Sequence, residues 1–189
     1  MPSVRVLACA LFTAAACGNP PDKEIQQAQG ALDAARAAGA GQYAHDEFAA
    51  AQDALKHAHE AVDERDYRLA LNHALDSRER AQNAAKEAAN HQAMARTDAY
   101  RAIAGASAAL EGARANLKTA ELAHAPARSL AAARRIIADV DEILQKARAA
   151  FDRGDYLAVA GSLGDAQSRL LATTRDLEAL ARPAGKRRR

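Results

Sequence analysis

A long stretch without proline, from Asp66 to about Leu122, most constrains how this chain folds. Within it alanine recurs at a strict seven-residue interval, at Ala74, Ala81, Ala88, Ala95, Ala102 and Ala109. A seven-residue repeat of small side chains is typical of a helix that packs closely against other helices. One helix over this stretch would be roughly 85 Å long at 1.5 Å per residue. We therefore expect other helices to pack along it in two places.

The composition supports a helical fold. Hydrophobic residues make up 49% of the 189 residues, but only 4% are aromatic and much of the remainder is alanine. Alanine is the best helix former and adds little volume, so this composition favours long helices in close contact over a thick core. Charged residues of both signs alternate, and the formal net charge of +2 gives no reason to expect a nucleic-acid partner.

Residues 1–16 have the pattern of a secretory signal peptide. A short basic start that ends at Arg5 precedes eleven uncharged residues, Val6 to Ala16, which are too few to span a bilayer. The segment from Ala14 to Gly18 around Cys17 also resembles a bacterial lipobox, although leucine is usual where this chain has Ala14. The alternative is ordinary cleavage after Ala16, which would give a soluble exported protein.

The lipobox resemblance implies that Cys17 becomes the lipid-modified first residue of the mature protein. Thioether-linked diacylglycerol supplies two acyl chains, and two chains hold a protein stably on a membrane. Cys9 would leave with the signal peptide, so no intramolecular disulfide would form. Gly18 is not the aspartate that often marks retention in the inner membrane. In a diderm host this favours an outer-membrane lipoprotein that faces the periplasm.

After a short tether at residues 17–21, we expect a first helical bundle over residues 22–100. Its first helix is expected to be capped by Asp22 and to end at Gly39, because glycine enters the left-handed conformation at little cost. A second helix begins near Asp46, and Asp66 caps the long helix, on which Leu71 and Leu75 face the first pair. The apolar stripe of the second helix is Phe48, Ala51, Leu55, Ala58 and Val62.

A second bundle is expected over residues 101–182, followed by a basic tail at 183–189. Gly105 and Gly112 each weaken the long helix, so a bend or break near Gly105 is the alternative, and we favour a continuous helix. Pro126 is expected at the first position of the next helix. The next stripe is Leu130, Ala133, Ile137, Val140, Leu144, Ala147 and Phe151, and that of the last helix is Tyr156, Ala160, Leu163, Gln167, Leu170, Thr174, Leu177 and Ala181.

The two halves of the chain are related by an internal repeat of 89 residues. This shift lays the stripe from Phe48 to Val62 on the stripe from Ile137 to Phe151, and it also aligns Asp66-Tyr67 with Asp155-Tyr156. The predicted fold is therefore all-α, with elongated antiparallel helical hairpins that form two three-helix bundles on one shared long central helix.

Six histidines raise the question of a metal site. His57 and His59 are two residues apart and so lie on different faces of a helix, whereas metal-binding pairs on one helix are three or four apart. His73 could approach His57 across the corner, but no further ligand set has suitable spacing. We expect no metal, no cofactor and no small-molecule substrate. Since the sequence also lacks a phosphate loop, a nucleophile elbow and a Cys-x-x-Cys motif, we do not expect an enzyme.

The corner at Asp66-Tyr67, the Tyr43-Ala44-His45 segment and the following alanine-rich run resemble the bacterial lipoproteins grouped as domain of unknown function 4398. Members of that family often have Tyr-Ala-Pro and Gly-Asp-Tyr at these two places. The resemblance implies a helical domain in the cell envelope and brings no catalytic residues. The same corners also resemble the turns of tetratricopeptide repeats, but an 89-residue period does not fit their 34-residue repeat.

These features predict an exported, lipid-anchored helical protein that acts as a scaffold, spacer or protein-interaction module, with a membrane contact through Cys17 and either a protein partner or self-association. The alternative is a soluble periplasmic chaperone or adaptor. The basic tail, Lys186 to Arg189, is interpreted as a solubilising end, and the alternative for it is a contact with anionic lipid or cell-wall polymer.

Overall fold

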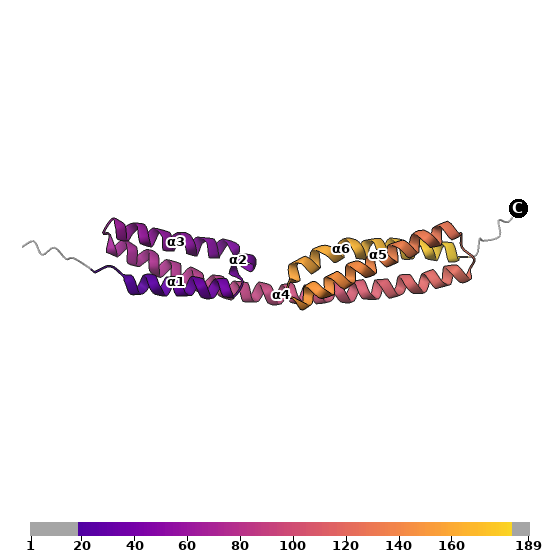
Figure 1. The fold of residues 1–189 in the computed structure, drawn as a ribbon, viewed down its shortest axis with the longest axis horizontal. Coiled ribbons are helices and arrows are strands. Elements are labelled where there is room, and N and C mark those ends of the chain that lie inside the picture. The colour runs from indigo at the N-terminus through magenta and orange to yellow at the C-terminus, as the bar shows by residue number, and fades with distance from the viewer. Residues whose placement is uncertain (1–18, 183–189) are drawn as a thin grey trace, which may run out of the picture. The chain divides into compact units, whose positions relative to one another are not determined.

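The computed structural model describes residues 19–182, and every regular element in this range is a helix (Figure 1). The predicted all-α class is therefore confirmed for the described residues. The helices are α1 (Asp22–Ala37), α2 (Ala40–Tyr43), α3 (His45–Asp63), α4 (Tyr67–Leu122), α5 (Ala127–Asp152) and α6 (Tyr156–Ala181).

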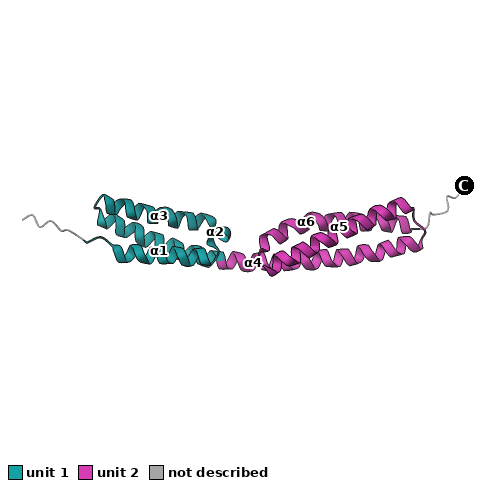
Figure 2. Ribbon diagram, viewed as in Figure 1, with its two compact units in different colours: residues 1–88 teal, residues 89–189 magenta. Residues whose placement is uncertain are grey.

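The chain divides into two compact units, and the long helix α4 contributes to both (Figure 2). The first unit contains α1, α2, α3 and the part of α4 up to Ala88. The second begins at Ala89 and contains the remainder of α4 with α5 and α6. The division falls at Ala88, whereas the sequence pattern suggested residue 100.

Small side chains form the contact between α3 and α4 in the first unit. The Ser77 hydroxyl is fully buried and donates a hydrogen bond of 2.8 Å to the carbonyl oxygen of Ala51. A side chain as short as serine reaches a neighbouring backbone only where two helices approach closely. The buried residues of α4 in this unit are Ala70, Ala74, Ser77, Ala81, Ala84 and Ala88.

The prediction that Leu71 and Leu75 face the first helical pair is wrong for Leu75, which is 37% exposed, while Leu71 is half-buried. Each residue turns 100° about the helix axis, so a leucine next to the buried Ala74 points away from the seam. The close packing of the first unit selects the alanines for the interior and leaves Leu75 outside.

The stripe predicted for α5 is confirmed from Leu130 to Ala147, all of it buried, and Phe151 is half-buried. The stripe predicted for α6 is only partly right, because Ala160 is exposed. Leu163 and two more leucines at seven-residue spacing are buried as expected. The other buried positions lie four residues before each of these leucines, as Val159 does before Leu163. The prediction placed them three residues before each leucine. The buried residues of α6 are Val159, Leu163, Ala166, Leu170, Thr173 and Leu177.

The alanine repeat of α4 continues in the second unit, but on a different set of residues. Ala102 and Ala109 are half-buried, whereas Ala99, Ala106, Ala113 and Ala120 are fully buried. Seven residues turn an α-helix about 20° short of two full turns, so a strict seven-residue series drifts around a helix. The helix runs through Gly105 and Gly112, which confirms the predicted continuity.

The turns that end α3 and α5 have the same hydrogen-bonding pattern. At the first, the N–H of Asp66 donates to Ala61 O at 2.9 Å and Arg65 has a positive φ of 61°. At the second, the N–H of Asp155 donates to Ala150 O at 3.0 Å and Gly154 has a φ of 84°. Both are Schellman motifs. All these pairs of positions differ by 89 residues, so the corner of the predicted repeat is present in the structure.

The aspartates of these corners cap the helices that follow. The Asp66 carboxylate accepts a hydrogen bond of 2.9 Å from the N–H of Leu69, as predicted, and Asp155 accepts from Ala158 at 3.4 Å.

Three other details of the helix ends differ from the prediction. Asp22 is the first residue of α1 and makes no capping hydrogen bond, and Pro126 lies just before α5, not inside it. The short helix α2 was not predicted. It follows Gly39, whose φ of 82° confirms the expected left-handed end of α1.

Candidate functional site

Two of the predicted functional elements lie outside the described residues. Cys17, the predicted lipidation site, precedes residue 19, and the basic tail from Lys186 to Arg189 follows residue 182. Both remain predictions from the sequence.

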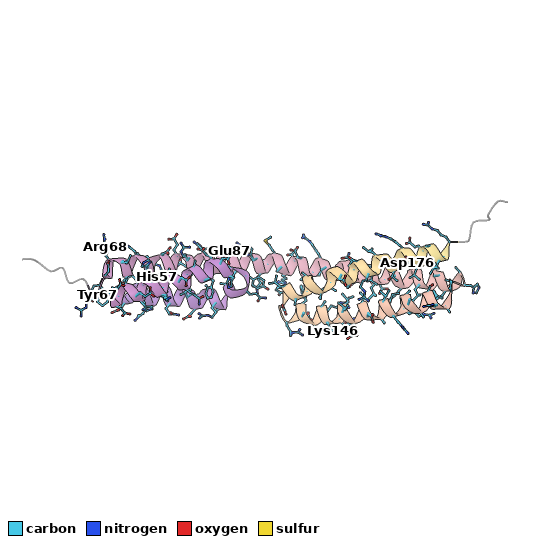
Figure 3. The ribbon with its side chains drawn as sticks, turned by 90° about the horizontal axis from the view of Figure 1, so that it is seen from above. His57, Tyr67, Arg68, Glu87, Lys146 and Asp176 are labelled. Atoms are coloured by element: carbon cyan, nitrogen blue, oxygen red, sulfur yellow. The ribbon has the colours of Figure 1, made fainter. Side chains whose placement is uncertain are left out.

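The histidine pair suggested by the sequence does come together on the first unit. His57 on α3 and His73 on α4 have ring centroids 5.5 Å apart at an interplanar angle of 42°. His57 Nδ1 also lies 2.9 Å from Glu60 Oε2. Figure 3 labels His57 among the side chains of the first unit. Within residues 19–182, no group of three or more histidine, cysteine, aspartate or glutamate side chains is arranged to hold a metal ion.

The electrostatics at this pair are those of an exposed helix surface. The hydrogen bond with His57 holds the pKa of Glu60 below its ordinary value, and the nearby Lys56 ammonium adds to the effect. The Lys56 Nζ atom lies 3.8 Å from Glu60 Oε1, and both side chains are more than half exposed. Exposed contacts of this kind contribute little to stability.

The second unit carries a groove with a volume of about 730 Å³. We call it the aromatic groove. Its floor is one face of α4, and its end wall is the corner between α5 and α6. The residues that line it are Ala89, Gln92, Ala93, Arg96, Thr97, Tyr100, Phe151 and Tyr156.

The sequence forms this groove in two ways. The lining residues of α4 recur at intervals of three and four, which places them on one side of the helix. The tight turn at Gly154 then brings Phe151 and Tyr156 together, with ring centroids 5.2 Å apart in an edge-to-face arrangement. Three of the seven Phe and Tyr residues of the chain therefore line one groove.

Two features of the aromatic groove bear on what it could bind. Tyr100 is 65% exposed, although it is a large aromatic side chain. Arg96 is the one charged residue in the lining, and it forms no ion pair with any described residue. Four of the ten other arginines described in the second unit are paired with a carboxylate, as Arg114 is with Asp141 at 3.1 Å, and the other six form no ion pair.

A smaller groove of about 250 Å³ lies on the other flank of the same turns of α4. Tyr156 borders both grooves, and the smaller one is also lined by Met94 and Leu157, which are 63% and 47% exposed. Large apolar side chains are thus exposed together around the open end of the second unit. Contiguous exposed apolar surface is typical of interaction sites.

Sequence reasoning did not find this surface. Met94 and Tyr100 were part of the long helix without an assigned role, and Phe151 and Tyr156 were assigned to apolar stripes. The sequence signal that could have indicated this surface is the position of Phe151 and Tyr156 on either side of the corner. At a corner the apolar stripes of the two helices end, and neighbouring helices cannot cover them fully.

None of the helices among residues 19–182 has the length and apolar character needed to cross a membrane. Comparison of the chain with protein-family models, with curated protein sequences and with solved structures found no significant match in any of the three. The resemblance to domain of unknown function 4398 stays a prediction.

Proposed function

We propose that this protein is an exported, lipid-anchored helical protein of the cell envelope that acts without catalysis as a scaffold or protein-interaction module. The proposal places it on the outer membrane, facing the periplasm. The observation that carries the interaction role is the exposed apolar surface formed by Met94, Tyr100 and Leu157 on the second unit. The sequence pattern around Cys17 supports the anchor.

The geometry of the helices supports an interaction role in a second way. Both units are built around α4, whose buried residues are mostly alanines, and the outer faces of the helices are exposed and could contact another protein. Amphipathic helices and grooves between helices are a recurring mode of peptide recognition.

The anchor is tested by replacing Cys17 with serine and following the protein by membrane fractionation and intact mass. We expect Cys17→Ser to move the protein to the soluble fraction and to remove the mass of the lipid. An unchanged membrane fraction together with an unchanged mass would contradict the anchor.

The interaction role is tested by amine-reactive crosslinking in cells at native expression, followed by affinity purification and mass spectrometry. We expect a reproducible envelope protein to copurify. If only monomer is recovered after crosslinking, the interaction role is wrong.

The aromatic groove also favours a second candidate, a soluble periplasmic chaperone or adaptor, because such proteins need exposed apolar surface for their clients. The protein without its first seventeen residues would then slow the aggregation of an unfolded client. No change in the aggregation rate at a molar excess would exclude this role.

A further inference from the structure

We infer that the aromatic groove binds an amphipathic helix of another protein, one that presents small or apolar residues to α4 and an acidic side chain to Arg96. This inference rests on the proposed function and adds the place and the chemistry of the partner.

The shape of the groove fits a helix. Its floor runs from Ala89 to Tyr100, which corresponds to about 16 Å of helix, or three turns. The alanines at 89 and 93 in this floor allow a second helix axis to approach to about 8 Å, the near end of the usual range. In the same unit α5 and α6 already pack on the alanines of α4, from Ala99 onward. A partner helix would use the same kind of contact on the turns that precede them.

The aromatic side chains supply the apolar anchor. Tyr100 stands 65% exposed at one side of the floor, and the Phe151–Tyr156 pair closes the end. Aromatic side chains around a groove are the usual sites of strong contacts in protein interfaces, because they bury a large area with few rotatable bonds. An apolar residue of the partner would lie between Tyr100 and this pair.

The charge of the groove selects the partner. None of the eight lining residues is acidic, and Arg96 is without an ion pair among the described residues. Two copies of the chain packed through this groove would place two Arg96 guanidinium groups in one interface, to which the lining residues contribute no carboxylate. Like charges disfavour that arrangement, whereas a carboxylate on a different protein complements it.

The test uses the full-length protein in cells that produce it natively, with Ala93 replaced by the photo-crosslinking residue p-benzoylphenylalanine. A control carries the same residue at Ala115, which is exposed on α4 of the same unit but does not line the groove. We expect a crosslink from position 93 and none from position 115. The crosslinked peptide, sequenced by mass spectrometry, should be an amphipathic segment with an aspartate or glutamate within one helical turn of the attachment point.

Charge reversal then tests the role of Arg96. We expect Arg96→Glu to lower the crosslink yield about tenfold, because it replaces an attraction by a repulsion. The matched control is Arg101→Glu, since Arg101 pairs with Asp98 and lies outside the groove, and it should leave the yield unchanged. Replacing the acidic residue of the partner by arginine should restore the crosslink yield of the Arg96→Glu variant to the wild-type level. Arg96 is exposed, so these variants should keep the wild-type circular dichroism spectrum.

Several outcomes would overturn the inference. These are a crosslink only to a second copy of the chain, a crosslink only to lipid, a yield that Arg96→Glu does not change, and no crosslink from position 93. If amine-reactive crosslinking recovers a partner while position 93 gives none, the proposed function stands and only this site is wrong. If neither experiment recovers a protein, both fail.

Discussion

Replacing Gly154 by alanine should destabilise the second unit, whereas replacing Gly161 by alanine should stabilise it. Gly154 and Gly161 both have open space around them, because nothing lies within 4 Å of a Cβ built at either position. They differ in backbone conformation. Gly154 has a φ of 84° at the corner before α6, while Gly161 lies inside that helix.

The magnitudes follow from these conformations. A side chain in the left-handed region costs about 1–2 kcal/mol, and the reduced freedom of the unfolded chain offsets about 0.4–1 kcal/mol of this cost. Gly154→Ala should therefore destabilise the second unit by roughly 1 kcal/mol. Gly161→Ala should stabilise it by about 1 kcal/mol, because alanine is favoured over glycine in a helix.

The assay is thermal unfolding by circular dichroism, together with hydrogen exchange of peptides from α6 to assign the change to the second unit. A change of 1 kcal/mol shifts the midpoint of a domain of this size by roughly 4–8 °C, so the two variants should lie on opposite sides of the wild type. Midpoints shifted in the same direction would refute the reasoning. The reciprocal variant Arg65→Gly should stabilise the first unit by about 1 kcal/mol, since Arg65 has a φ of 61°.

Three further predictions concern buried and charged contacts. Ser77→Ala removes the hydrogen bond to Ala51 O and should cost about 0.5–1.5 kcal/mol in urea unfolding; an unchanged midpoint would contradict the close α3–α4 contact. Leu144→Ala should cost about 2–5 kcal/mol in the same assay because Leu144 is 1% exposed, and a cost below about 1 kcal/mol would argue against a tightly packed core. The pKa of Glu60 is lowered chiefly by its hydrogen bond with His57, so the stability from this contact is present above pH 4.5 and is lost as the pH falls through the lowered pKa. In an NMR titration, His57→Ala should raise the pKa of Glu60 toward 4.5, and no change would exclude His57 as the main cause.

The sequence predicted some parts of the fold well because local chemistry decides them. The stripe of α5 repeats apolar residues at three and four without interruption, and its interior is the one expected. The corners at Asp66 and Asp155 were also found, since a capping carboxylate and a left-handed residue are local requirements of a helix end.

Other parts depended on neighbouring helices. Val159 and Ala160 both lie beside the leucine series of α6, and only the packing against α4 and α5 selects Val159 for the interior. The candidate site was missed for a similar reason. The exposure of Met94 and Tyr100 depends on where α5 and α6 end along α4, and helical spacing carries no information about that.

The sequence by itself determined the long helices, the cap at Asp66 and the repeated corner, because each depends on residues within a few positions of one another. The tertiary structure decided which of two adjacent faces of α4 and α6 is buried and which apolar residues stay exposed. Burial is a property of pairs of helices, and the choice between adjacent faces depends on which side chains fit against the neighbour. The aromatic groove is formed in this way, because α5 and α6 pack on α4 from Ala99 onward and leave the preceding turns of α4 uncovered.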